Sequence, residues 1–217
     1  MAYKKSQKMV ERRQARRRLL LDTAIRLFGR LGYHPATVPM IVREAQSSTG
    51  AFYLYFRNKE DVYAAALEEI GQRLAAALNQ AIERETIPDA RMSAAVEGLV
   101  RWLAGHPSEA RILMEAATLG GRIEQARRAI VESHVRSVVA ALQSAAPSVD
   151  ARDRPIVARC WVGAVLEAAM GWLAMPEPDR PEAGQLARVV ASFNLRGAEM
   201  TAGASAAHDF PRSAESL

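Results

Sequence analysis

The chain has 217 residues, of which 49% are hydrophobic and 24% are charged, and its formal net charge is +5. This length and apolar content allow one large or two small packed domains and exclude a disordered chain. The single cysteine, Cys160, excludes an internal disulfide framework and favours a reducing, cytoplasmic location.

The sequence does not predict a membrane protein or an exported one. Its basic N-terminus runs into an amphipathic stretch, without the apolar region and cleavage site of a signal peptide. The most apolar segment, Cys160 to Met175, is interrupted by Glu167 and is shorter than the about 20 residues that cross a bilayer. We therefore expect a soluble, cytoplasmic protein with no membrane partner.

The positive charge is concentrated at the N-terminus. Residues 1–60 contain 13 Lys and Arg against 4 Asp and Glu, whereas the rest of the chain contains 16 against 20. Such asymmetry is typical of an N-terminal module that meets a polyanion, although a solvated basic arm with no specific partner would show the same charge.

Apolar residues at helical spacing predict three short helices followed by a long one. The first contains Leu20, Ala24, Leu27 and Phe28 and ends at Gly32. The others run from Val38 to about Ala45, from Thr49 to about Phe56, and from Asn58 toward Pro88; Thr37, Ser48 and Asn58 are their expected N-caps.

The helical pattern continues beyond Pro88, and no segment alternates as a strand would. Helices are expected over about 89–103, 107–119, 123–145 and 154–175, and around Leu186 to Phe193. The predicted fold is all-α, with a basic N-terminal module of three short helices followed by a longer helical region. The domain boundaries are expected at 1–61 and 62–200, with a flexible tail at 201–217.

The third helix crowds four aromatic residues into five positions, and helical geometry divides them. Phe52 and Phe56 fall on the side expected to face the core, whereas Tyr53 shares another side with Thr49. Gly50 lies beside them, and its small size would let the start of this helix approach a partner closely. Two short helices joined by a three-residue turn form a helix-turn-helix, whose second helix enters the major groove.

These features together resemble the DNA-binding domain of the TetR family of transcriptional regulators. The resemblance rests on Ala-Ile-Arg-Leu-Phe at 24–28, Gly-Tyr at 32–33, Thr-Val at 37–38, Ser-x-Gly at 48–50, Tyr-x-x-Phe at 53–56 and Asn-Lys-Glu at 58–60. No single one of these elements is specific for the family, but their combined order and spacing are. The turn departs from the family pattern, because Gln46 stands where glycine is usual; a left-handed glutamine there would cost on the order of 1 kcal/mol.

The resemblance implies particular roles for residues of the helix-turn-helix. Thr37, Tyr53 and Lys59 would contact phosphates, and Tyr55 stands where the family often has a phosphate-contacting histidine. The base-facing start of the recognition helix would be Thr49, Gly50 and Ala51, with Ser48 as its cap. Five arginines before this domain, at positions 12, 13 and 16–18, would add sequence-independent affinity, although adjacent arginines cannot all share one helical face.

The resemblance also implies what the two parts of this all-α fold do: an N-terminal three-helix DNA-binding domain that contains a helix-turn-helix is followed by a helical ligand-binding and dimerisation domain. The segment from Cys160 to Met175 is apolar on almost every side, which predicts burial on more than one face and pairing with a second copy. Candidate effector-binding residues are Trp102, Met114, Trp161 and Met170, and they favour an apolar or aromatic effector. Glu115, Glu167 and His134 are candidates for its polar contacts.

Enzymatic functions find little support. The four histidines are scattered and form no metal-ligand set with Cys160, and no phosphate-binding glycine-rich loop or nucleophile motif is present. We therefore predict a homodimeric, TetR-type repressor without metal or cofactor, released from a palindromic operator by a small effector. Alternatives are an effector-independent activator or architectural DNA binder and, from another class, an all-helical lipophile carrier or enzyme.

Overall fold

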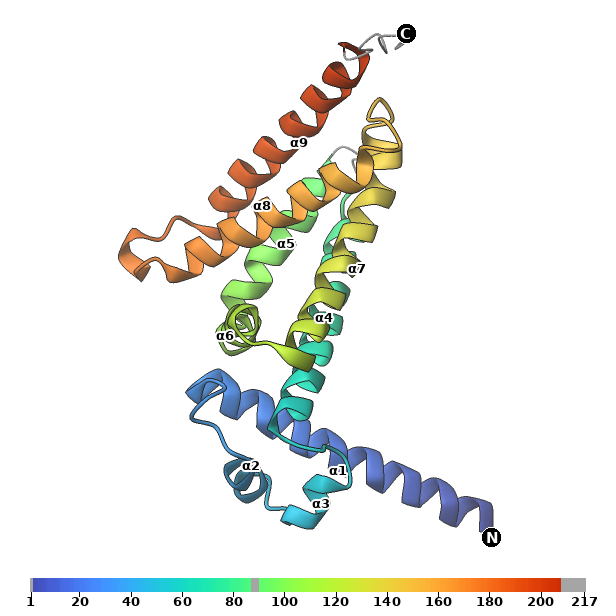
Figure 1. Cartoon of the computed structure of the whole chain (residues 1–217), viewed down its shortest axis with the longest axis vertical. Coiled ribbons are helices and arrows are strands. Elements are labelled where there is room, and N and C mark those ends of the chain that lie inside the picture. The colour runs from blue at the N-terminus through green and yellow to red at the C-terminus, as the bar shows by residue number, and fades with distance from the viewer. Residues whose placement is uncertain (1, 87–89, 208–217) are drawn as a thin grey trace, which may run out of the picture. The chain divides into compact units, whose positions relative to one another are not determined.

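The computed structural model describes residues 2–86 and 90–207, and all the regular structure in these ranges is helical (Figure 1). The α-helices are α1 (Ala2–Leu31), α2 (Val38–Glu44), α3 (Thr49–Tyr53), α4 (Lys59–Arg84), α5 (Arg91–Gly105), α6 (Pro107–Glu115), α7 (Gly121–Ala145), α8 (Arg154–Ala174) and α9 (Ala183–Ala207). Two 3-10 turns, at Ala116–Thr118 and Glu177–Asp179, follow α6 and α8. The all-α prediction is confirmed.

The chain divides into two compact units. The first contains residues 1–76 and 102–130, and therefore α1 to α3, most of α4, α6 and the start of α7. The second contains residues 77–101 and 131–217. The predicted boundary between DNA-binding and effector-binding domains at residue 61 stays a prediction, but the first packing unit extends beyond it.

The first unit has a core built on the C-terminal half of α1. Its apolar stripe is buried together with Ile41 of α2 and Phe52 of α3, as the spacing predicts. Gly32 ends α1 with φ +86 and donates its N–H to Phe28 O at 2.7 Å, a left-handed stop that a residue with a Cβ adopts only under strain. Gly29 lets α6 approach, because a Cβ there would lie 2.5 Å from Ser108 Cβ.

Two elements differ from their predicted extents, and a third begins earlier than its apolar residues indicate. Helix α1 begins at Ala2, so the basic residues before Leu20 belong to the first helix. Helix α3 ends at Tyr53 and continues only as a turn, in which Phe56 N–H still donates to Phe52 O at 3.0 Å. Helix α9 runs to Ala207, into the predicted tail, and residues 208–217 of that tail lie outside the described residues.

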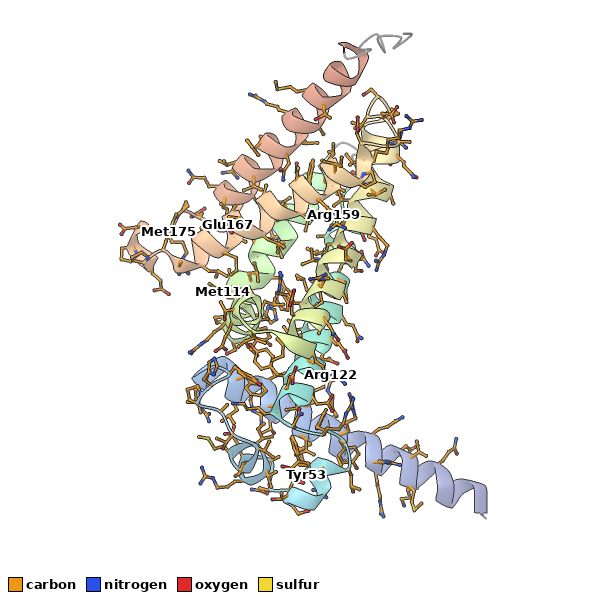
Figure 2. All side chains as sticks on the ribbon, in the orientation of Figure 1. Tyr53, Met114, Arg122, Arg159, Glu167 and Met175 are labelled. Atoms are coloured by element: carbon orange, nitrogen blue, oxygen red, sulfur yellow. The ribbon has the colours of Figure 1, made fainter. Side chains whose placement is uncertain are left out.

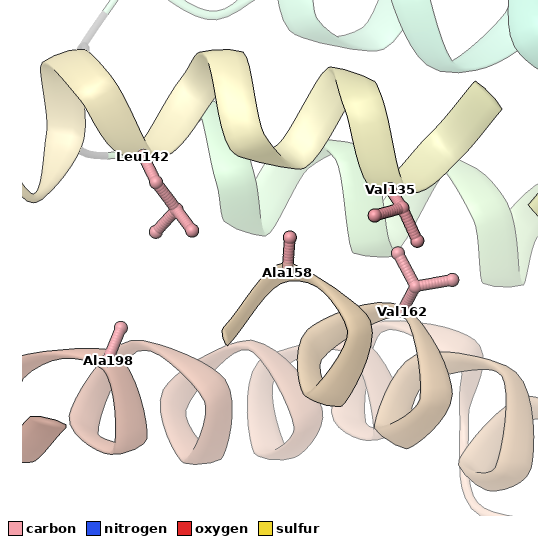
Figure 3. Packing of buried hydrophobic residues seen from close by; sticks show 5 residues of the cluster. All are labelled: Val135, Leu142, Ala158, Val162 and Ala198. Carbon is pink, nitrogen blue, oxygen red and sulfur yellow. The ribbon is translucent and has the colours of Figure 1, made fainter. Parts of the chain in front are cut away.

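The second unit packs α7, α8 and α9 around a small apolar cluster. Figure 3 shows Val135 and Leu142 of α7 facing Ala158 and Val162 of α8, with Ala198 of α9 beside them. By length and apolar composition alone α8 could cross a bilayer, a property that the core helix of a globular protein shares. Here α8 buries six side chains, at Ala158, Trp161, Val162, Val165, Ala169 and Trp172.

Candidate nucleic-acid interface

Helix α2 is fixed at both ends by local hydrogen bonds. Thr37 caps its start, where the hydroxyl oxygen accepts the N–H of Met40 at 3.4 Å. At its end, Ser47 N–H donates to Val42 O at 2.9 Å and Gln46 N–H to Arg43 O at 3.1 Å. This pair of bonds defines a Schellman motif, in which Gln46 takes the left-handed position with φ 48. The turn thus keeps its usual geometry although its residue is not glycine.

The start of α3 is the most open part of the helix-turn-helix. Ser48 caps the helix by accepting the N–H of Ala51 at 3.1 Å, and Thr49 and Gly50 are exposed. A Cβ added to Gly50 would meet no atom within 4 Å, so nothing in the chain itself requires a small residue there. Capping uses only an acceptor lone pair of Ser48, and its O–H stays available to donate to a phosphate.

The aromatic residues of this segment divide as helical geometry predicts. Phe52 and Phe56 are buried with ring centroids 5.5 Å apart, while Tyr53 on α3 is 55% exposed (Figure 2). The Tyr53 ring meets Phe52 edge to face at 5.4 Å, which holds the exposed ring against the core. Tyr55 is half-buried. Thr49, Gly50 and Tyr53 therefore form a free surface beside a rigid core.

Lys59 is more constrained than a surface lysine. Its Nζ donates to Tyr33 O at 2.8 Å and His34 O at 3.2 Å and lies 4.2 Å from the centroid of the Tyr33 ring. Partial burial lowers the pKa of the Lys59 ammonium, while the Glu115 carboxylate opposes that shift. The ammonium ties the loop after α1 to the start of α4, and it has one donor left for another partner.

Contacts between residues far apart in the sequence also hold the loop after α1. No spacing pattern in the sequence predicts them. The Glu115 carboxylate accepts the N–H of Tyr33 with both oxygens, at 2.9 and 2.8 Å. Tyr63 is fully buried and donates its hydroxyl to Ile112 O at 3.0 Å; burial, reinforced by Glu115, raises its pKa. Glu115, a candidate for an effector contact, is thus engaged with the loop between α1 and α2. Its partner lies 82 positions away, beyond the reach of local patterns.

The four candidate effector residues lie in different places. Trp102 is buried in the first unit, stacked on His106 at 4.5 Å, and Met114 is partly buried on α6 of the same unit. Trp161 is buried and Met170 partly buried on α8, in the second unit. The effector-binding role of all four stays a prediction. Among the described residues no group of three or more His, Cys, Asp or Glu could hold a metal ion.

Comparison with known proteins finds a likeness in the N-terminal segment. Residues 20–66 match the family model described as bacterial regulatory proteins, tetR family. The transcriptional regulator HbdR of Aromatoleum sp. (strain CIB) is 35% identical over 83 residues, which are 38% of this chain and 36% of that protein. This likeness therefore spans little more than a third of either protein.

Solved structures extend the likeness of fold to most of the chain. The fatty acid degradation regulator FadR of Bacillus halodurans superposes with a TM-score of 0.70 at 20% identity, over 84% of this chain and 95% of that one. FadR of Bacillus subtilis, solved in complex with stearoyl-CoA, gives 0.69 at 20% identity, over 82% and 97%. At these identities the likeness shows the fold alone.

Proposed function

We propose that this chain, whose residues 20–66 match the family model of bacterial regulatory proteins, tetR family, is a homodimeric, DNA-binding transcriptional regulator that a small effector releases from its operator. In this proposal α3 enters the major groove with Thr49, Gly50 and Ala51 toward the bases. Thr37, Ser48, Tyr53, Tyr55 and Lys59 contact the phosphates.

The observation that carries the proposal is the free surface at the start of α3. A hydroxyl, a glycine and an aromatic ring, at Thr49, Gly50 and Tyr53, are exposed together on a short helix whose other side is locked into the core by Phe52. A rigid, open helix start of this kind is what base readout in the major groove needs.

Dimerisation is proposed through the outer face of α9 with α8. Phe193 and Met200 are 69% and 76% exposed, at positions 7 apart, and they line a hollow of about 540 Å³ with Val189 and Gly197. Residues one or two turns apart on one helix form a continuous apolar stripe, which a second copy would cover. A twofold dimer would present two α3 helices to successive major grooves, about 34 Å apart.

The effector is proposed to be apolar or aromatic and to bind in the helical region after residue 61. Support comes from the bulky side chains of that region, including Trp102 and Trp161, and from a structural neighbour solved with stearoyl-CoA. The effector would favour a spacing of the two heads that no longer fits the operator. As a regulator of transcription, the protein would act in the cytoplasm.

Selection of bound duplexes from a random library tests the proposal. The wild-type protein should enrich a palindrome whose half-sites are one helical turn or a multiple of it apart. Tyr53→Ala should bind the enriched duplex about tenfold more weakly, because it loses a hydrogen bond to a charged phosphate. Leu54→Ala is the matched control, because Leu54 is also exposed but the proposal gives it no contact. Recovery of no common sequence, or equal binding by Tyr53→Ala, would contradict the proposal.

A second measurement separates the alternatives. Addition of candidate effectors to the complex with the enriched duplex should release the DNA for at least one apolar compound. A DNA binder that no compound releases would be the effector-independent activator or architectural protein. Absence of DNA binding altogether would favour the lipophile carrier or enzyme.

A further inference from the structure

Residues 7–19 of α1 form a helical extension that buries none of its side chains. The buried stripe of α1 begins at Leu20, whereas every residue from Gln7 to Leu19 is exposed. At 1.5 Å per residue, Arg12 lies about 12 Å along the helix beyond Leu20. Figure 1 shows this end of α1 running on past the bundle of α2 and α3. Burial of an apolar face therefore does not explain why these residues form a helix.

The charges of the extension oppose a helix in isolation. Arg12 and Arg16, and Arg13 and Arg17, are like charges four positions apart, and each such pair destabilises a helix by about 0.2–0.5 kcal/mol. An isolated segment of this length is marginal in water even without repulsion. A polyanion that neutralises the arginines would remove this penalty.

The five arginines divide between two environments. Arg18 is paired, since its Nε lies 3.1 Å from Asp22 Oδ2 and its Nη2 lies 3.0 Å from Glu69 Oε1. Arg17 places its guanidinium over the Phe56 ring, 5.4 Å from the centroid. Arg12, Arg13 and Arg16 have no ion pair with any residue whose side chain the structure describes. Helical geometry places these three within about 100° of one another.

The three unpaired arginines face the helix-turn-helix across one hollow. This hollow, of about 540 Å³, has walls from α1, from the α2–α3 turn and from α3, with Arg12, Arg13, Arg16, Gln46, Ser47, Ser48, Ala51 and Tyr55 lining it. Three arginines and two hydroxyl-bearing residues, Ser48 and Tyr55, thus line one hollow beside the exposed start of α3. No acidic residue lines it. Convergent guanidinium and hydroxyl donors suit phosphate oxygens.

We propose that Arg12, Arg13 and Arg16 of α1 bind backbone phosphates of the duplex strand that borders the groove entered by α3. The α1 extension and the α2–α3 turn together form this phosphate-binding surface. The inference rests on the proposed function and deepens it, because it assigns the DNA contacts of the extension to three of its five arginines. These contacts carry no sequence information and set the affinity and its salt dependence.

The test measures binding to a duplex enriched by the wild-type protein, and to a scrambled duplex, by fluorescence anisotropy over a range of KCl concentrations. Each of Arg12→Ala, Arg13→Ala and Arg16→Ala should lower the slope of log affinity against log salt by about 0.9, and the triple variant by about 2.7. The loss should be the same on both duplexes. Alanine is the best helix former, so the helix itself should persist.

Controls distinguish failure of the inference from failure of the proposed function. Arg18→Ala should keep the wild-type slope within about 0.3, because Arg18 is already neutralised by Asp22 and Glu69. A triple Arg→Lys variant at positions 12, 13 and 16 should retain most of the wild-type slope, which shows that charge is what the DNA requires. Wild-type protein that binds no duplex would overturn the proposed function. A DNA-binding wild type whose triple alanine variant keeps its slope would overturn only the inference.

Discussion

Replacing Gln46 with glycine should stabilise the protein, because this residue takes a left-handed conformation at the end of α2. Its φ is 48, and its side chain is exposed. The left-handed region costs an L-residue with a Cβ about 1–2 kcal/mol. Glycine removes this cost. It also increases the entropy of the unfolded chain, which cancels about 0.4–1 kcal/mol of the gain in stability. The expected net gain is about 0.5–1 kcal/mol.

Urea unfolding followed by far-ultraviolet circular dichroism, at one fixed protomer concentration, measures the change. Gln46→Ala is the matched control, because it removes the side chain but keeps the strained φ, and it should leave the free energy of unfolding within about 0.5 kcal/mol of the wild type. Gln46→Val should destabilise, since a β-branched residue tolerates this region least. A glycine variant no more stable than the alanine variant would refute the argument from backbone strain.

The same variants show whether Gln46 serves DNA binding. Gln46 lines the hollow beside α3, so its side chain has a position from which it could contact a duplex. If the glutamine is kept for such a contact, both Gln46→Gly and Gln46→Ala should bind the enriched duplex more weakly, although one is more stable and the other is not. If the wild type and both variants bind the duplex equally, a contact with DNA does not explain why the strained glutamine is kept at this position.

Three further predictions concern the contacts around the loop after α1. Lys59→Met keeps the stem near the Tyr33 ring but removes the ammonium, so the salt slope of DNA binding should fall by about one on every duplex; an unchanged slope would limit Lys59 to its two carbonyl contacts. Glu115→Ala leaves Tyr33 N–H without its acceptor, so it should lower the free energy of unfolding, measured in urea, by about 1–2 kcal/mol. The control Glu124→Ala breaks only an exposed ion pair with Arg128 and should lower the free energy of unfolding by less than about 0.5 kcal/mol. Tyr63 has a folded pKa above its ordinary value, so its contribution to stability is complete below about pH 10 and is lost as the pH rises further. Tyr63→Phe should therefore be less stable than wild type at pH 7 but lose less stability between about pH 10 and 12; an identical alkaline loss in both proteins would contradict this assignment.

The helix-turn-helix could be predicted from the sequence because its determinants are local. Caps, breakers and apolar spacing fix α2 and the start of α3, and they place Phe52 inside and Tyr53 outside. The end of α3 was less predictable, since Tyr53 to Phe56 has helical spacing but forms a turn after Tyr53. The sequence also did not predict that the basic segment before Leu20 is helical, because a run of arginines without an apolar stripe has no hydrophobic periodicity.

The effector site could not be located by the same means. A segment that is apolar all round, such as α8, must be covered on several sides, but its pattern does not say whether another helix, a second copy or a ligand covers it. Tryptophans have the same ambiguity: Trp172 is buried and donates its indole N–H to Pro181 O at 2.7 Å, which gives it a role in holding the loop after α8. Side-chain chemistry alone therefore cannot separate the lining of a pocket from the core.

The contacts of α6 explain why the first packing unit reaches beyond the helix-turn-helix. Arg111 Nη1 donates to Arg30 O at 3.0 Å, so a cation from α6 caps the C-terminal end of α1, where the helix dipole is negative. One turn later Glu115 binds Tyr33 N–H of the following loop, and Lys59 closes the same loop from α4. Hydrogen bonds tolerate little displacement, so a movement of α6 by one or two ångströms would break these contacts or carry the end of α1 with it. The C-terminal end of α1 and the loop that follows it are therefore tied to the position of α6 by Arg111 and Glu115.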